Sequence, residues 1–468
     1  MFISNENVAI VSQAVYNKKM HYLLRILFAG FCLLIAVPLC AVAENIPAGG
    51  NTWLGAWLSQ KTATGNWGGL RQSLTNKGVA LSANFTTDIL GNPVGGLKQA
   101  ARYAGFLQVT ATLDLEQIAS FKGWALTATN YVASGRNLSG VIGNFYGVQE
   151  IFASGDYYFG VLDLSLTLPG DKVILEAGRL FAGDVFAISP LWQYYVSAIN
   201  SNLISISNNV FFPHFQVAAW GARATYEPDK QWQFAGGVYA ADPSVGDPDK
   251  HGLDFSFNAG HGCLAIGQLN YKHHQDRKGS GLPGSATFGG YYDSSKFIGI
   301  IDSSRTWQGN YGFYFIMDQM IYRGDWPEFS GPAHLRSEAG YSERIKQPYY
   351  PRTAIAADRP KGLTAWWAAY LAPQEDINTQ TYQLAGGLVY QGLPPNRNRD
   401  VTAFCVIYGN FNDKLSGQDA ETVLELNHRF QVNPWCYITP DIQYIINPDG
   451  RHDIDNALVL GAEASFNF

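Results

Sequence analysis

The 468-residue sequence is poor in cysteine, in charge and in long apolar runs. Only Cys263, Cys405 and Cys436 lie in the body of the chain, and their number and spacing fit neither a disulfide framework nor a zinc site. Charged residues make up 15% and the net charge is -6, which gives no sign of a nucleic-acid partner. Beyond residue 39 no apolar run approaches the roughly 20 residues of a membrane-spanning helix. Membrane helices are therefore excluded from the body of the chain.

The one long apolar run lies near the N-terminus. Two lysines and an arginine precede the run 26–39, and Ala41-Val42-Ala43 follows it as a small-x-small cleavage motif. We predict that residues 1–43 are a signal peptide cleaved after Ala43, which would leave a net charge of about -8. An uncleaved anchor helix is the alternative, but the run is short for one. Met20 offers a second start and a more ordinary signal length.

Glycine and aromatic residues are abundant: 49 Gly, 26 Tyr, 27 Phe and 12 Trp. At the C-terminus, Leu458, Leu460 and every second residue to Phe468 are apolar, whereas Glu463 and its alternate neighbours are small or polar. The segment 456–468 thus predicts a strand with one apolar and one polar face. Soluble chains rarely end on a buried aromatic residue, because termini usually sit in water. A terminal aromatic on the apolar face is typical of the closing strand of a membrane barrel.

The same alternation recurs along the chain, in segments 79–88, 107–116, 162–168, 424–430 and 438–444. Their polar faces carry charge, and an Arg or Lys on the lipid face costs about 2–4 kcal/mol at mid-membrane, so these faces should line a wet lumen. The remaining ~420 residues, at roughly 25 per strand and loop, give about 16 strands. We therefore predict an all-β protein, with a transmembrane antiparallel β-barrel of about 16 strands over residues 79–468.

One segment ahead of the first predicted strand breaks this pattern. In residues 68–78, Leu70 and Leu74 are four apart, Lys77 falls in the last turn and Gly78 suits a C-cap. The sequence predicts a short helix there, within an N-terminal periplasmic segment 44–78.

Several stretches, in order, resemble one family, the carbohydrate-selective, OprB-like porins of Gram-negative outer membranes. They are Gly65-Asn-Trp-Gly-Gly-Leu-Arg71, Gly91-Asn-Pro-Val-Gly-Gly96, Gly178-Arg179, Gly386-Gly-Leu-Val-Tyr-Gln-Gly-Leu393 leading to Arg399-Asp400, Pro440-Asp-Ile-Gln-Tyr-Ile-Ile-Asn-Pro448, and Ala457-Leu-Val-Leu-Gly461 with Phe468. The resemblance covers nearly all of the predicted mature chain, and residues 440–448 with the terminal Phe are its most specific part.

This resemblance implies a single barrel of sixteen strands that lets small sugars diffuse across the outer membrane. It implies a channel with no enzymatic activity, no cofactor and no metal. The expected partners are small carbohydrates as permeants and outer-membrane lipid, with no nucleic acid. Whether the channel works as a monomer or as a trimer stays open.

Sugar hydroxyls would exchange hydrogen bonds with polar side chains at a constriction, and aromatic faces would guide the apolar side of the ring. The predicted pore-lining residues are Asp88, Asn92, Arg102, Tyr103, Asp114, Glu116, Glu176 and Arg179. Arg179 is the first choice because it matches the Gly-Arg pair of the family, although a role in anchoring a strand end is the alternative.

Other polar and aromatic groupings have simpler interpretations. His273-His274 with Asp276, and the stretch 247–251, predict loop charge rather than metal ligands. Trp366-Trp367 predicts part of an aromatic belt. No Gly-x-Ser-x-Gly motif singles out a nucleophile, so a barrel enzyme or an adhesin is a distant alternative, behind a general or organic-solute porin.

The segment between Arg323 and Lys361 departs from the family pattern, because five prolines and mixed charge stand where a short connection is usual. Counting strands back from Phe468 places this segment on the periplasmic side, where turns are normally short. Either the count is wrong or the chain carries an extra periplasmic element.

Overall fold

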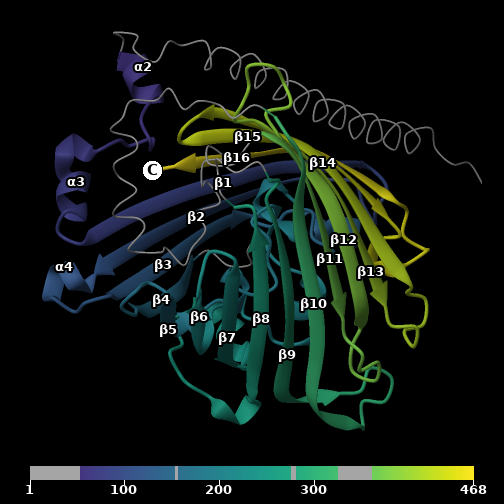
Figure 1. The fold of residues 1–468 in the computed structure, drawn as a ribbon. Helices are drawn as coiled ribbons and strands as arrows, with labels where there is room; N and C mark the ends of the chain where they lie inside the picture. Colours follow the sequence, from purple (N-terminus) through teal and green to yellow (C-terminus); the bar gives the residue numbers. More distant parts are fainter. Residues whose placement is uncertain (1–52, 153–156, 276–280, 325–360) are drawn as a thin grey trace, which may run out of the picture.

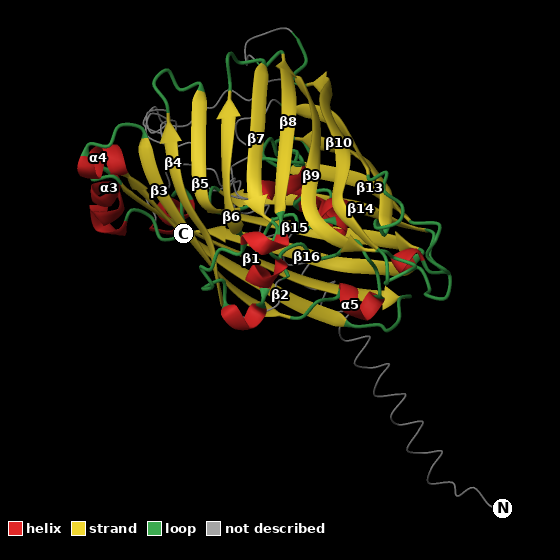
Figure 2. Cartoon of the chain, turned by 90° about the horizontal axis from the view of Figure 1, so that it is seen from below, coloured by secondary structure: helices red, strands yellow, loops and turns green. Residues whose placement is uncertain are grey.

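The computed structural model describes residues 53–152, 157–275, 281–324 and 361–468. These residues form sixteen antiparallel strands that close into one barrel, in which each strand pairs with its sequence neighbours and β1 pairs with β16 (Figures 1 and 2). The predicted fold class and strand number are confirmed. The predicted signal peptide, residues 1–43, lies outside the described residues.

The strands have these bounds: β1 Val79–Val94, β2 Ala101–Asp114, β3 Trp124–Gly135, β4 Tyr157–Thr167, β5 Val173–Leu180, β6 Ala219–Tyr226, β7 Trp232–Ala240, β8 Cys263–His273, β9 Gly284–Ile298, β10 Thr306–Arg323, β11 Gly362–Leu371, β12 Gln380–Gln391, β13 Val401–Phe411, β14 Ala420–Asn433, β15 Cys436–Ile446 and β16 Ala457–Asn467.

Short helices occupy the connections: α2 Trp53–Leu58, α3 Leu70–Thr75, α4 Leu115–Ala119, α5 Ser139–Ile142 and α6 Ile204–Asn209, with 3-10 turns η1 Trp67–Gly69, η2 Ala182–Asp184, η3 Trp192–Tyr194, η4 Ala198–Asn200, η5 Pro243–Gly246, η6 Pro248–Lys250, η7 Ala259–His261 and η10 Pro448–Gly450. Among the described residues no helix is both long enough and apolar enough to cross a membrane.

The C-terminal strand closes the barrel, as its alternation predicts. β16 pairs with β1 in a register that sets Glu463 opposite Asp88 and Phe466 opposite Phe85. The amide of Phe468 donates to the carbonyl of Ala83 at 2.9 Å, so the last residue is still held by the first strand. Phe468 thus completes the seam between the two ends of the barrel.

The two ends of the barrel differ. The C-terminus, α2 and α3 lie at one end (Figure 1), and the amide of Ala63 bonds to the carbonyl of Asn467 at 2.7 Å there. The long connections that include residues 136–152, 181–218 and 241–262 lie at the other end. Because barrels of this kind have short periplasmic turns and long outer loops, the end with the chain terminus is periplasmic.

As the strand count from Phe468 predicts, β10 ends at Arg323 and β11 begins at Gly362 at the periplasmic end, and these two residues pair. Residues 325–360 themselves are outside the described part. The helix before β1 is shorter than predicted, since α3 covers only Leu70–Thr75 and Gly78 follows at φ 85°. The strand predicted over 107–116 also ends early, at Asp114, where α4 begins.

Two outer connections fold into the barrel and fill part of the lumen. Residues 181–218 form the lumen loop, and residues 136–152 form the short inner loop. From the lumen loop, Trp192, Tyr195 and Ile206 join one buried apolar cluster with Tyr314 and Trp366 of the wall. The lumen beside β10–β14 is therefore packed with protein rather than open, and this packing decides where a solute can pass.

Candidate functional site

A cavity of about 830 Å³ lies under the lumen loop. The loop forms one wall, and strands β5–β12, with Gln108 of β2, form the others. Lys272, Arg323 and Gly362 line it as well, so the cavity extends to the periplasmic ends of the strands. Its volume falls within the roughly 300–1,000 Å³ of sites that hold small molecules.

Neutral amides are numerous in the polar lining, beside the charged side chains of Glu176, Asp184, Arg223, Glu227, Lys272, Asp318 and Arg323. The amides are Gln193, Asn200 and Asn202 of the lumen loop, Gln108, Gln233, Gln268, Asn270 and Gln391 of the strands, and Gln275 just after β8. Each amide offers both donors and an acceptor. Phe215, which is partly exposed, adds aromatic surface to the same cavity, whereas Phe181 and Tyr194 contribute to its wall but are almost fully buried. Such a lining suits an uncharged solute that has many hydroxyl groups and one apolar face.

Two of the charged residues in the cavity wall form a buried pair. Arg223 of β6 donates through Nε to Glu176 Oε2 at 2.6 Å and through Nη2 to Oε1 at 2.7 Å, a two-pronged contact between directly opposed residues. Nη1 donates to the carbonyl of Phe181 at 2.7 Å. The pair therefore joins the barrel wall to the first residue of the lumen loop.

Two further acids flank this pair in the cavity wall. Asp318 of β10 accepts from Ser189 Oγ of the lumen loop at 2.9 Å and from Ser285 Oγ of β9 at 3.2 Å. Burial raises the pKa of the loop residue Asp184 to about 8, an effect that Arg223 opposes and that Glu176 and Asp163 reinforce. Near neutral pH this carboxyl is thus largely a hydrogen-bond donor.

The sequence matches the family model described as carbohydrate-selective porin, OprB family, over residues 98–468. The chain belongs to the carbohydrate-selective porin family. Porin B of Pseudomonas aeruginosa is 24% identical over 447 residues, which are 86% of this chain and 90% of that protein. Structures of Pseudomonas putida OprB at high and low pH have TM-scores of 0.74 and 0.55 with 21% and 20% identity, and each comparison covers 88% of this chain and 99% of the other.

The protein is therefore a carbohydrate-selective porin, a channel for sugars and not an enzyme. Its family and barrel fold place it in the outer membrane of a Gram-negative bacterium. Within the described residues no three His, Cys, Asp or Glu side chains gather as a metal site.

Four of the predicted pore-lining residues lie on the inner face of this porin. Glu176 lines the cavity. Asp88 is fully buried on the inner face of β1, opposite Glu463. Arg102 shares the inner face of β2 with buried Ala104 and donates to the carbonyl of Ala101 at 3.0 Å.

Asn92, the fourth of these, is engaged by the backbone of the β1–β2 connection. Its Nδ2 donates to the carbonyls of Gly95 at 3.0 Å and Lys98 at 2.8 Å, and its Oδ1 accepts from the amide of Ala100 at 2.9 Å. All three contacts hold a turn together. Asn92 therefore shapes the outer rim of the barrel.

The other four residues have other placements, and their contacts do not support a pore-lining role. Tyr103 is 44% exposed on the outer face of β2, opposite the outward Ile89. Asp114 caps α4 by accepting from the amides of Glu116 at 3.0 Å and Gln117 at 3.2 Å. Glu116 is exposed in the periplasmic turn, where its Oε2 accepts from the amide of Gly123 at 3.2 Å.

Arg179, the first choice from the sequence, lies on the outer face of β5 with exposed Leu175 and Ala177. It is nevertheless only 1% exposed, because the β7–β8 connection folds over it. Its guanidinium donates to the carbonyls of Gly252, Asp254 and Ala218 and lies 5.4 Å from the ring of Phe255. Arg179 therefore ties that connection to the outside of the barrel.

The sequence interpretation missed Arg223 and the whole lumen loop. Arg223 lies on the same face of β6 as Gly221 and Thr225. The alternation of these three residues with apolar neighbours is the sequence feature from which an inward position of Arg223 could have been predicted. Trp366 was also misassigned, since it points inward, is 3% exposed and donates through Nε1 to Tyr195 Oη at 2.8 Å. Trp367 is the outward member of the pair, at 43% exposure.

Proposed function

We propose that small sugars enter the periplasm through the cavity under the lumen loop and bind there weakly. The observation that carries this proposal is the joint lining of neutral amides and aromatic rings in a space of about 830 Å³. A sugar hydroxyl that exchanges water for an amide gains only about 0.5–1.5 kcal/mol per hydrogen bond, so the solute can leave again. The partly exposed ring of Phe215 favours the apolar side of the sugar ring.

The pairing of charge supports selection for neutral solutes. Glu176 and Arg223 neutralise each other within the wall, so neither offers an unpaired charge to an ionic solute. Beside this pair, a carboxylate or ammonium solute would lose hydration without gaining a matching partner, which is costly. Uncharged sugars lose less hydration because the amides replace it.

Liposome swelling tests this selectivity. We expect a neutral hexose to enter liposomes that contain the porin faster than an organic acid or an amino acid of similar size. Equal rates for solutes of equal size would contradict sugar selectivity and favour a general porin. Liposomes with heat-denatured protein provide the control for leakage.

The titration of Asp184 predicts a dependence of ion selectivity on pH. With a pKa of about 8, this residue should gain a negative charge between about pH 6 and pH 9, and the cation preference of the channel should rise. Because the folded protein holds this proton more tightly than the unfolded chain, the unfolding free energy should fall as pH rises from about 4 toward 8. Reversal potentials in a salt gradient measure the first effect. Asp184→Asn should remove it, and a rise that persists in this variant would assign the titration to another group.

We also propose that residues 1–43 act as a cleaved signal peptide for export. We further propose that a single barrel is enough to conduct. N-terminal sequencing of the outer-membrane protein should find Glu44 first. One chain lines the whole cavity. Monomers purified in detergent and inserted into a planar bilayer should therefore have the same conductance per pore as any larger assembly.

A further inference from the structure

Two glutamates on the inner face of β14 bind the backbones of the two loops that fold into the barrel. Glu421 accepts from the amides of Phe145 at 2.7 Å and Tyr146 at 2.8 Å, in the short inner loop. Glu425, four residues on, accepts from the amides of Val196 at 2.7 Å and Ser197 at 3.2 Å, in the lumen loop. Both carboxylates are fully buried.

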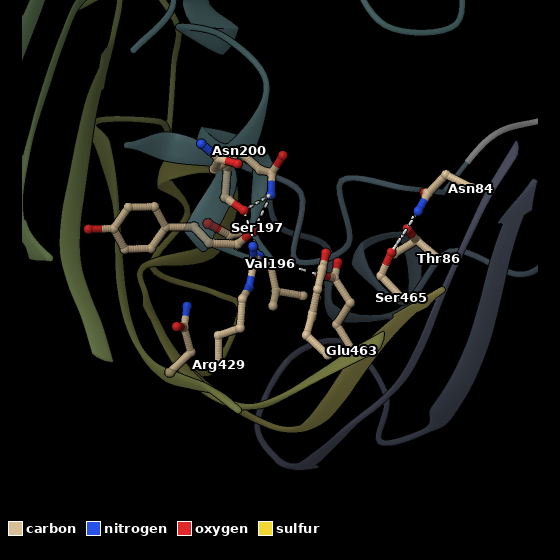
Figure 3. Close-up of polar contacts among 12 residues, drawn as sticks. Asn84, Thr86, Val196, Ser197, Asn200, Arg429, Glu463 and Ser465 are labelled. Carbon is tan, nitrogen blue, oxygen red and sulfur yellow. Dashed lines mark hydrogen bonds and ion pairs between the residues drawn. The ribbon is translucent and has the colours of Figure 1, made fainter. Parts of the chain in front are cut away.

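Arg429 continues the same row after another four residues. Its Nη2 donates to the carbonyl of Gln193 at 2.6 Å, and its guanidinium lies 5.1 Å from the ring of Tyr194. Figure 3 shows Val196, Ser197 and Asn200 of the lumen loop close to the Arg429 side chain. We name Glu421, Glu425 and Arg429 the β14 clamp.

The loops held by the clamp are also bonded to each other. The amide of Glu150 donates to the carbonyl of Val196 at 3.1 Å, and the amide of Ala198 donates to the carbonyl of Gly147 at 2.8 Å. These bonds lie beside the two amides that Glu425 binds. A movement of the lumen loop away from Glu425 would therefore disturb the short inner loop as well.

The β14 clamp binds the same part of the lumen loop, residues 193–200, that lines the cavity. Gln193, Tyr194 and Asn200 line the cavity, and Arg429 and Glu425 bind the backbone between them. Buried backbone amides need partners, and leaving such a donor without an acceptor is costly. The carboxylate of Glu425 thus fixes the distance between the lumen loop and the wall.

We propose that the β14 clamp sets the aperture of the channel, with Glu425 as the positioning residue for the lumen loop and Glu421 as its partner through the short inner loop. The part of this inference that concerns sugars rests on the proposed path under the lumen loop. The part that concerns the aperture does not, because ion flow reports it directly.

The test compares Glu425→Gln, Glu421→Gln and the double variant by single-channel recording in potassium chloride. Glutamine keeps the shape but turns one acceptor into a donor that faces a backbone amide. Losing one buried hydrogen bond corresponds to about a tenfold change in equilibrium. We expect about tenfold more time in a second conductance level for Glu425→Gln, and more than the product of the single effects for the double variant, because the loops support each other.

Glu375→Gln, in the exposed β11–β12 connection, is the matched control and should behave as wild type. Heat-modifiable migration on gels should show an assembled barrel for every variant.

Unchanged conductance, noise and sugar block in an assembled Glu425→Gln barrel would overturn the proposal. Absence of sugar block in the wild type, together with altered ion conductance in Glu425→Gln, would contradict the sugar path and leave the clamp supported. If Glu425→Gln does not assemble, Glu425→Asp, which keeps the charge but shortens the reach, should assemble with an intermediate effect, and a wild-type recording from it would overturn the proposal.

Discussion

Replacing Arg223 by alanine should destabilise the barrel by about 3–5 kcal/mol, because the change leaves the Glu176 carboxylate buried without its partner. The side chains of Arg223 and Glu176 are only 1% and 6% exposed, so water cannot easily replace the lost contacts. The carbonyl of Phe181 loses a donor in the same change. Urea unfolding of the refolded barrel in lipid vesicles, followed by tryptophan fluorescence, measures the loss.

The double variant Glu176→Gln with Arg223→Met is the control for this experiment. It removes both charges, and replacing both members of a buried pair is often close to neutral. We therefore expect most of the lost stability to return. Equal destabilisation of Arg223→Ala and the double variant would show that packing, rather than an uncompensated charge, determines the effect.

The fold could be predicted because alternation along a strand is a local property. β16, β1 and β4 each carry an apolar face and a polar face that a reader can find within ten residues. Helix capping is local too, yet Asp114 was read as part of a strand face. Its role became apparent only from the amides of Glu116 and Gln117 that it caps.

The two faces of a strand are harder to assign than their alternation. Arg179 is polar and buried, which fits a lumen position, but its burial comes from the β7–β8 connection on the outside of the barrel. Trp366 is apolar and would suit lipid, but it packs against the lumen loop. Segments far away in the sequence bury both residues, and this burial cannot be predicted from the residues next to them in the chain.

The lumen loop has the weakest local signal of all, although it forms one wall of the site. Its short turns and the helix α6 are held by partners far away in the sequence, among them Glu425, Asp318 and Tyr370. The inner face of β13, with Ala403, Cys405 and Ile407 buried, is apolar for the same reason. A lumen that is partly filled by its own loops departs from the simple rule of polar interiors.

A matched pair of arginine substitutions on β2 should separate the two faces with a large effect. Val109 is 42% exposed on the outer face, and the adjacent Gln108 lines the cavity. Val109→Arg should cost about 2–4 kcal/mol, because the charge would lie in lipid near the middle of the strand. Gln108→Arg should cost much less, because its charge enters a polar, water-accessible lumen.

The two variants should also differ in ion selectivity, which provides a second measurement besides stability. Gln108→Arg adds a positive charge to the cavity, so the reversal potential should shift toward anions, whereas folded Val109→Arg channels should keep the wild-type value. Unfolding free energies in lipid vesicles and reversal potentials in a salt gradient supply the two measurements. A Gln108→Arg barrel as unstable as Val109→Arg would place both side chains in apolar surroundings and contradict the cavity beneath the lumen loop. Because the two positions are adjacent and receive the same side chain, a large difference between the variants should reflect the face of the strand.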